Sequence, residues 1–162
     1  YLEPAIKTLE QICSNEIFEP YCNKSIIHLM RREYDDAYKY AERALKNCPK
    51  TLTLDIIMLS INLIIIKLCR QQFTVKEALI ALEQLSNQYP LIEDPWYEFQ
   101  LLYNRRQLAE VVRHEEVSLE TSHQRYISEY CNTKTKFYIL EYLPVQNIKV
   151  ELCLGLSPNW RY

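Results

Sequence analysis

The side chains that could do acid–base, nucleophilic or metal chemistry are few and far apart. The three histidines are His28, His114 and His123. His114-Glu115-Glu116 lacks the second histidine that a helical zinc site needs, and His28 falls in an aromatic position between predicted helices. No Ser/His/Asp or Cys/His set can be assembled from the spacings. We therefore predict no catalytic residue, no metal site and no cofactor site, so that the chain is not an enzyme.

The six cysteines likewise lack a chemical pattern. None forms a C-x-x-C pair, and no Cys/His cluster has zinc-ligand spacing. Most fall on apolar helix faces, where a thiol behaves as a small hydrophobe. We interpret them as reduced, structural thiols, which favours a cytoplasmic location with the nucleus as the alternative. They are Cys13, Cys22, Cys48, Cys69, Cys131 and Cys153.

Composition excludes several classes of function. The 162 residues include 48% hydrophobic and 25% charged residues with a net charge of −2, which describes a folded domain without an electrostatic preference for nucleic acid or membrane. Glycine occurs once, at Gly155, whereas phosphate-binding loops and dinucleotide folds need several. The longest apolar run, residues 56–66, is far shorter than the roughly 20 residues that span a bilayer. We expect a buried helix there and no membrane span.

Helical periodicity dominates the first two thirds of the chain. Ala37, Ala41 and Ala44 recur at three- and four-residue steps and predict a helix within residues 31–50 that ends before Pro49. Thr74-Val75-Lys76-Glu77 reads as a capping box that opens another helix. Asp94-Pro95 marks a third start, with Asp94 as cap and Pro95 in the first turn. Residues 108–117 are expected to form a final, separate helix.

Several of these landmarks repeat. Ala37 and Pro49 are 12 residues apart, as are Ala78 and Pro90, and the two pairs are offset by 41 residues. Tyr21, Lys24, Ser25 and His28 have the spacing of a first-helix pattern, W-x2-L-G-x2-Y, and so do Trp96, Phe99, Gln100 and Tyr103. Gln100 stands where a small residue is expected, which predicts looser packing.

Over roughly residues 2–106 this set resembles the tetratricopeptide repeat (TPR) superfamily. The resemblance implies a mainly α fold, a helical-repeat solenoid of antiparallel helix pairs. We assign residues 1–117 to this repeat domain.

The character changes at residue 118. Lys136–Leu143 is rich in aromatic and β-branched residues, and residues 148–156 alternate strictly between two faces. With a short turn between them, they predict a β-hairpin. Residues 118–162 are therefore expected to be an appendage of one helix plus this hairpin, and a hairpin alone is marginal in water. It must pack on the helices, extend a sheet or meet a partner.

The resemblance also implies a concave groove lined by the first helix of each repeat. Its acidic members, Asp94 and Glu98, would repel a carboxylate, which argues against the family's clamp for chaperone tails. We expect a non-catalytic protein–protein interaction scaffold or adaptor, a subunit or fragment of a larger complex, that binds a helix or extended peptide there. The alternative is a regulatory subunit that positions or activates a catalytic partner. The expected groove residues are Cys22, Asn23, Ile26, Met30, Tyr97, Glu98, Leu101 and Asn104.

Overall fold

The computed structural model describes residues 3–4, 7–8, 11, 18–90, 94–113, 136–143 and 148–155. For Trp96, Arg113 and residues 136–143 and 148–150 it describes the backbone. Predictions made for Cys13 and Cys131 and for His114 and His123 lie outside the described side chains. The expected domain boundary after residue 117 lies outside the described residues as well.

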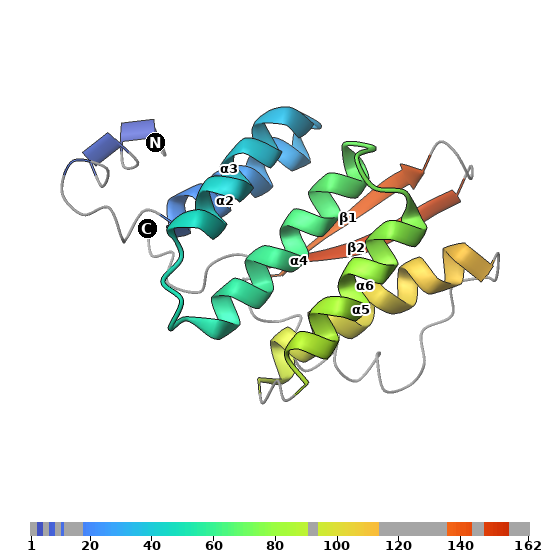
Figure 1. The fold of residues 1–162 in the computed structure, drawn as a ribbon. Helices are drawn as coiled ribbons and strands as arrows, with labels where there is room; N and C mark the ends of the chain where they lie inside the picture. Colours follow the sequence, from blue (N-terminus) through green and yellow to red (C-terminus); the bar gives the residue numbers. More distant parts are fainter. Residues whose placement is uncertain are drawn as a thin grey trace.

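The described part of the chain is mainly helical, as predicted. Consecutive helices contact one another along the chain, and α4 also contacts α6. Figure 1 shows the helices side by side, with the two strands lying across one side of α4. Within the described residues, no helix is both long and apolar enough to span a bilayer. The helices are α2 (Phe18–Met30), α3 (Tyr34–Asn47), α4 (Thr53–Cys69), α5 (Val75–Gln88) and α6 (Pro95–Arg113).

Helix α3 packs through small side chains. Ala37, Ala41 and Ala44 are all buried, with exposed fractions of 0–2%. Side chains of this size allow neighbouring helices to approach closely. The helix ends at Asn47, immediately before Cys48 and Pro49, because the residue before a proline is disfavoured in the helical region.

Helix α4 is the central element of the helical array. It contacts α3, α5, α6 and the second strand, which explains why its sequence is apolar on nearly every side. Asn62, one of two polar residues in the middle of this apolar helix, is also buried, with 1% of its surface exposed. A buried amide of this kind must find hydrogen-bond partners.

Two helices end in the same backbone motif. Arg32 after α2 and Gln71 after α4 each have φ of 62°. In both places the next amide reaches back five residues, from Glu33 to the His28 carbonyl and from Gln72 to the Lys67 carbonyl. This is a Schellman ending, in which glycine is the usual left-handed residue. At the start of α5, the predicted capping box between Thr74 and Glu77 is confirmed.

Helix α6 is longer than the sequence predicted. It begins at Pro95, as predicted, but it runs without a break to Arg113. The separate helix expected from residue 108 is therefore wrong. Residues 104–113 contain no proline or glycine, so nothing in the sequence interrupts the helical hydrogen bonds there.

Two antiparallel strands follow, β1 (Lys136–Leu143) and β2 (Ile148–Gly155). Their register pairs Phe137 with Leu154 and Ile139 with Leu152. Strand β2 contacts both α4 and α6. Of the three arrangements left open for the hairpin, the structure therefore has the strands packed on the helices.

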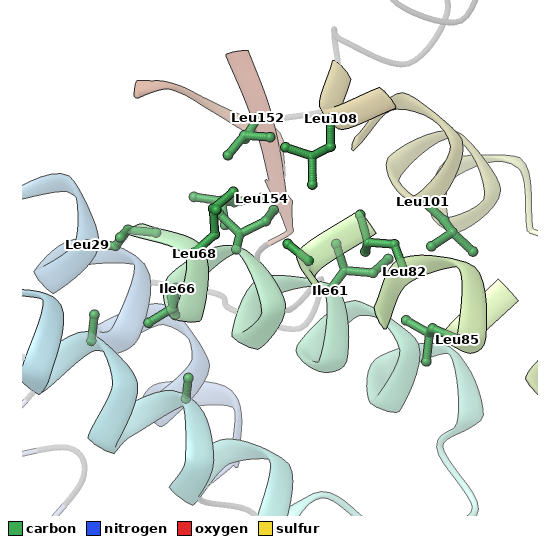
Figure 2. Close-up of a cluster of buried hydrophobic side chains, with 14 of the residues drawn as sticks. Leu29, Ile61, Ile66, Leu68, Leu82, Leu85, Leu101, Leu108, Leu152 and Leu154 are labelled. Carbon is green, nitrogen blue, oxygen red and sulfur yellow. The ribbon is translucent and has the colours of Figure 1, made fainter. Parts of the chain in front are cut away.

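The main hydrophobic core is shared by helices and strand. Leu152 and Leu154 of β2 are fully buried and belong to the same cluster as Ile61, Leu82 and Leu108. Figure 2 shows the two β2 leucines among side chains from the helices. The other face of β2 is buried too at Cys153 and Gly155, so this end of the strand is an internal part of the fold.

Candidate functional site

The most unusual feature of the molecule is the way the helices hold the edge of β2. Leu152 and Leu154 face the core, and the backbone groups of Cys153 and Gly155 are bonded by buried side chains of α4 and α6. We call the surface around this edge the strand groove. It is formed by Cys22 of α2, Met58 and Asn62 of α4, and Gln100 and Asn104 of α6.

Asn104 bonds both backbone groups of Cys153. Its Oδ1 accepts from the Cys153 amide at 2.8 Å, and its Nδ2 donates to the Cys153 carbonyl, also at 2.8 Å. The same Nδ2 donates to the Gln100 carbonyl at 2.9 Å. Because a backbone N–H can only donate, this pairing fixes which end of the Asn104 amide is oxygen.

Asn62 repeats the arrangement one step along the strand. Its Oδ1 accepts from the Gly155 amide at 2.9 Å, and its Nδ2 donates to the Gly155 carbonyl at 2.7 Å. The remaining hydrogen-bonding positions of the amide are also used. Gln100 Nε2 donates to Oδ1 at 3.2 Å, and Nδ2 points to Cys22 Sγ at 3.9 Å. A fully satisfied buried amide of this kind favours a single arrangement of the surrounding chain.

Gln100 and Cys22 connect the two asparagines to the strand. Gln100 Nε2 also donates to the Cys153 carbonyl at 3.4 Å, and the Cys22 thiol points to the Gly155 carbonyl at 3.8 Å. Gln100, at the position where looser packing was expected, is fully buried. Its side chain fills the space between Asn62 and Cys153, where a small residue would leave a gap.

The two asparagines take the place of a neighbouring strand. Residues of an antiparallel strand alternate in the direction of their N–H and C=O groups, so Cys153 and Gly155 present theirs on the same edge. These two residues lie about 7 Å apart along an extended chain, since each residue rises about 3.4 Å. A side-chain amide offers the same donor and acceptor as a peptide group. The strand groove therefore binds the backbone N–H and C=O groups of two residues that lie two positions apart in an extended strand.

The strand groove is uncharged. Asn62, Gln100 and Asn104 carry neutral amides, which neither titrate nor act as nucleophiles at ordinary pH. Nearby, burial raises the pKa of Tyr97 far above its usual value, with help from Asp55 and Asp94, so its hydroxyl stays protonated. Recognition in this groove depends on hydrogen bonds and apolar contacts.

A second buried region lies near the N-terminus of α4. Burial, followed by the charges of Asp55 and Glu19, raises the pKa of the Cys48 thiol to about 11. Thiolate is the nucleophilic form of cysteine, so Cys48 is an inert side chain at neutral pH. Burial and then Glu19 raise the pKa of Asp55, although its position in the first turn of α4 is favourable for a carboxylate.

The structure brings some of the predicted groove residues to β2. Cys22 and Asn104 contact its backbone. Ile26 and Leu101 are buried in the main core, so their side chains contribute to stability. The others divide between buried Asn23 and Tyr97 and exposed Met30 and Glu98.

Sequence reasoning missed Asn62 and Gln100 as groove residues. Both were visible as exceptions to a pattern. Asn62 interrupts the most apolar segment of the chain, and Gln100 replaces a small residue in the first-helix pattern. A polar residue in an otherwise buried position needs a partner, and that requirement was the available signal.

Two other clusters of polar side chains lie outside the strand groove. His28, Glu33 and Asp36 place one potential ligand atom each within 4.8 Å of one another. His28 Nδ1 already pairs with Glu33 Oε2 at 2.5 Å, and its ring stacks on Tyr40. These contacts hold the turn between α2 and α3, and both carboxylates are exposed.

The second cluster is a surface pocket lined in part by Tyr21, Lys24, Tyr40 and Arg43. Lys24 forms an ion pair with Glu3 and lies 4.3 Å from the centre of the Tyr40 ring. Its positive charge is therefore already engaged within the chain.

No protein-family model matches the chain, and no curated protein and no solved structure matches it either.

Proposed function

We propose that this chain is a non-catalytic protein–protein interaction adaptor of the helical-repeat type, whose strand groove binds an extended peptide through its backbone. In this structure β2 of the same chain lies in the groove and shows what kind of ligand fits. A sister subunit or partner protein that carries such a segment would bind in the same way in place of β2.

One observation carries this proposal. Asn62 and Asn104 each make paired hydrogen bonds to one residue of an extended strand, at Gly155 and Cys153. Both asparagines are buried, at 1% and 0% exposure. Without a strand in place, the side-chain amides of Asn62 and Asn104 would lose their four hydrogen bonds to backbone groups. Because the surrounding surface is largely apolar, each group left unsatisfied would cost about 1–3 kcal/mol.

The same geometry selects an extended ligand over a helical one. Inside a helix, the backbone amides and carbonyls already bond to each other. They cannot also pair with Asn62 and Asn104. An extended peptide presents free groups at every second residue on one edge, which matches the spacing of the two asparagines.

Internal repetition supports the helical-repeat part of the proposal. Asn23 of α2 and Asn62 of α4 are 39 residues apart, and so are the left-handed residues Arg32 and Gln71 that end these helices. Asn104 of α6 lies 42 residues beyond Asn62. Each first helix of the expected pairs thus carries a buried asparagine.

Binding of a peptide to a chain with a vacated groove tests the proposal. In the full chain, Cys153→Pro removes the backbone N–H that donates a hydrogen bond to Asn104. Proline is also incompatible with the bonded edge of a strand. A fluorescent peptide with the sequence of residues 148–156 should bind this chain in anisotropy titrations under reducing conditions. If the vacated chain is poorly folded, the peptide should instead restore its helical circular dichroism.

Matched variants make the test specific. Adding Asn104→Leu to the Cys153→Pro chain should weaken peptide binding at least about tenfold, since two backbone hydrogen bonds are lost. Asn87→Leu, at an exposed position of α5, should leave binding unchanged. Absence of both binding and restored folding would contradict the proposed function.

A further inference from the structure

We infer that the surface pocket between the N-terminal residues and helices α2 and α3 binds the phosphate group of a phosphorylated side chain in a partner protein. We call it the cationic pocket. Its lining includes Glu3, Lys7, Tyr21, Lys24, Tyr40 and Arg43. The pocket shares no residue with the strand groove, so the inference goes beyond the proposed function and can fail without it.

The cationic pocket is open and has preformed walls. Its volume is about 570 Å³, which lies in the range of roughly 300–1,000 Å³ that is usual for ligand-binding pockets. One wall is α2 and the other is α3, which pack side by side (Figure 1). The rings of Tyr21 from α2 and Tyr40 from α3 are stacked at 5.9 Å. A ligand therefore meets walls that are already in place.

Lys24 gives the pocket a buried positive charge. Only 7% of its side chain is exposed, and its Nζ is paired with the carboxylate of Glu3. Burial opposes the charge of Lys24, but hydrogen bonds to Glu3 and Tyr40 outweigh burial and raise the pKa of the ammonium group. Lys24 is therefore charged at neutral pH, and its ion pair shows that the pocket accommodates an anionic oxygen.

The pocket keeps an excess of positive charge after this pairing. Lys7, Lys24 and Arg43 carry three positive charges and Glu3 carries one negative charge, which leaves an excess of two. Among the described residues, neither Lys7 nor Arg43 forms an ion pair with a carboxylate. A phosphate monoester carries a charge of about −1.5 to −2 at pH 7. It matches this excess, whereas a single carboxylate would neutralise half of it.

Helix α3 adds a second reason to expect an anion here. Lys39 and Arg43 are exposed and four residues apart, a spacing at which like charges repel each other on a helix. Both are held beside the pocket, with Lys39 Nζ 5.6 Å from the Tyr40 ring and the Arg43 guanidinium 5.7 Å from the Tyr21 ring. An anion between them would relieve the repulsion. A guanidinium group can also donate to two phosphate oxygens at once.

The local extent of the charge selects the kind of partner. The chain as a whole has a net charge of −2, so the excess belongs to the pocket and not to a broad basic surface. Nucleic acids present a row of phosphates and are bound by such broad surfaces. One phosphorylated side chain needs only a compact set of cations. Lys7 and Arg43 are exposed and can therefore reach a group that projects from another protein.

Titration of the full chain with a short peptide tests this inference. The probe is a pentapeptide of four alanines around a central phosphoserine, and nuclear magnetic resonance follows the backbone amides of Lys24 and Arg43. We expect these signals to shift in a saturable way, with serine in place of phosphoserine giving no shift and glutamate binding at least about fivefold more weakly. No shift with phosphoserine would overturn the inference. Inorganic phosphate that binds as tightly as the peptide would overturn the partner side chain as the ligand.

Substitutions at the rim make the test specific without disturbing the core. Arg43→Gln and Lys7→Gln should each weaken binding of the phosphoserine peptide at least about fivefold. Lys76→Gln removes the same charge from an exposed position of α5 and should leave binding unchanged. Equal losses for Arg43→Gln and Lys76→Gln would show that binding follows net charge alone, which contradicts a phosphate site in the pocket.

Glu3→Gln gives a change in the opposite direction. It removes the one carboxylate of the pocket lining, which raises the excess of positive charge, so the phosphoserine peptide should bind at least about twofold more tightly. Weaker binding to this variant would contradict the charge balance on which the inference depends. Each of these results leaves the strand groove and its peptide test untouched.

Discussion

Asn104 is the residue on which the geometry of the groove depends most directly. It donates to the Cys153 carbonyl and accepts from the Cys153 amide, at 2.8 Å each. A charged isostere at this position would keep the acceptor and lose the donor. That difference allows the role of the amide to be separated from its shape.

We predict that Asn104→Asp is destabilising in a pH-dependent way. An ionised Asp would face the carbonyls of Cys153 and Gln100 without a donor, at a cost of about 3–5 kcal/mol for an unpaired buried charge. Burial raises the pKa of such a carboxyl group. The protonated acid can again donate, so stability relative to the wild type should be highest at low pH and should fall as the pH rises through the raised pKa.

Urea denaturation of both chains between pH 4 and pH 8 measures this effect. Asn87→Asp, on the exposed face of α5, is the control and should show little difference from wild type at any pH. A penalty for Asn104→Asp that does not change with pH would contradict the proposed pair of hydrogen bonds.

Asp55 gives a second residue-scale prediction. Its Oδ1 is buried and has no hydrogen-bond partner among the described residues, and burial together with Glu19 raises its pKa above 3.8. A raised folded-state pKa means that the folded state favours the protonated form. Stability is therefore greatest below the unfolded-state pKa and declines as the pH rises through the folded-state value.

Asp55→Asn removes this decline. We expect the variant to unfold at the same or a lower urea concentration than wild type near pH 3, and at a higher concentration than wild type at pH 7. Asp36→Asn, at an exposed position in the first turn of α3, should give no such gain. A constant difference between Asp55→Asn and wild type across this range would refute the account of Asp55.

At the scale of elements, the ends of α2 and α4 hold local strain. Arg32 and Gln71 have φ of 62°, a conformation that costs a residue with a side chain about 1–2 kcal/mol. We predict that Arg32→Gly and Gln71→Gly each stabilise the protein, by about 0.5–1 kcal/mol after the larger entropy of glycine in the unfolded chain is included.

Thermal and urea unfolding check these two variants. Arg31→Gly is the matched control, because Arg31 precedes the left-handed residue and is not among those with positive φ. It should lose stability through the entropic cost of glycine alone. A loss for Arg32→Gly equal to that of Arg31→Gly would show that the left-handed conformation carries no strain.

The elements were also the part of the fold that the sequence predicted best. Three local signals each predicted a helix where the structure has one. They are the spacing of Ala37, Ala41 and Ala44, the capping box that begins at Thr74, and the proline at position 95. The extra boundary expected near residue 108 rested on a fading repeat pattern instead of a breaking residue. It was wrong because no local feature stops the helix.

The candidate site could be predicted only in part. Asn104 and Cys22 were identified through the expected face of the first helices. Asn62 was not, because its partner Gly155 lies 93 residues away in the chain, and neither helical nor strand periodicity reports such a distance. An unexplained polar residue in an apolar helix showed that a partner was needed, but not where it would come from.

At the scale of the whole molecule, the C-terminal strand completes the helical array. The repeat pattern stops well before residue 136, which led us to expect an appendage. Leu152 and Leu154 are nevertheless fully buried in the main core. Helices and strand therefore share one hydrophobic core in the described part of the chain.

We predict that a chain ending at residue 135 is much less stable than the full chain. Losing the two leucines alone removes about 3–6 kcal/mol of burial, which is a large share of the 5–15 kcal/mol typical of a domain. The melting temperature should fall by about 10–20 °C. Circular dichroism melts of both chains decide the matter, and an unchanged melting temperature would show that the strand is dispensable.

Hydrogen exchange at Cys153 and Gly155 tests the central claim most directly. Both amides donate to buried asparagine side chains, so they should exchange much more slowly than the amides of an exposed edge strand. Asn62→Leu should speed exchange at Gly155 more than at Cys153, and Asn104→Leu should do the reverse. Rapid exchange of both amides in the wild-type chain, at the rate of an exposed edge strand, would contradict the account.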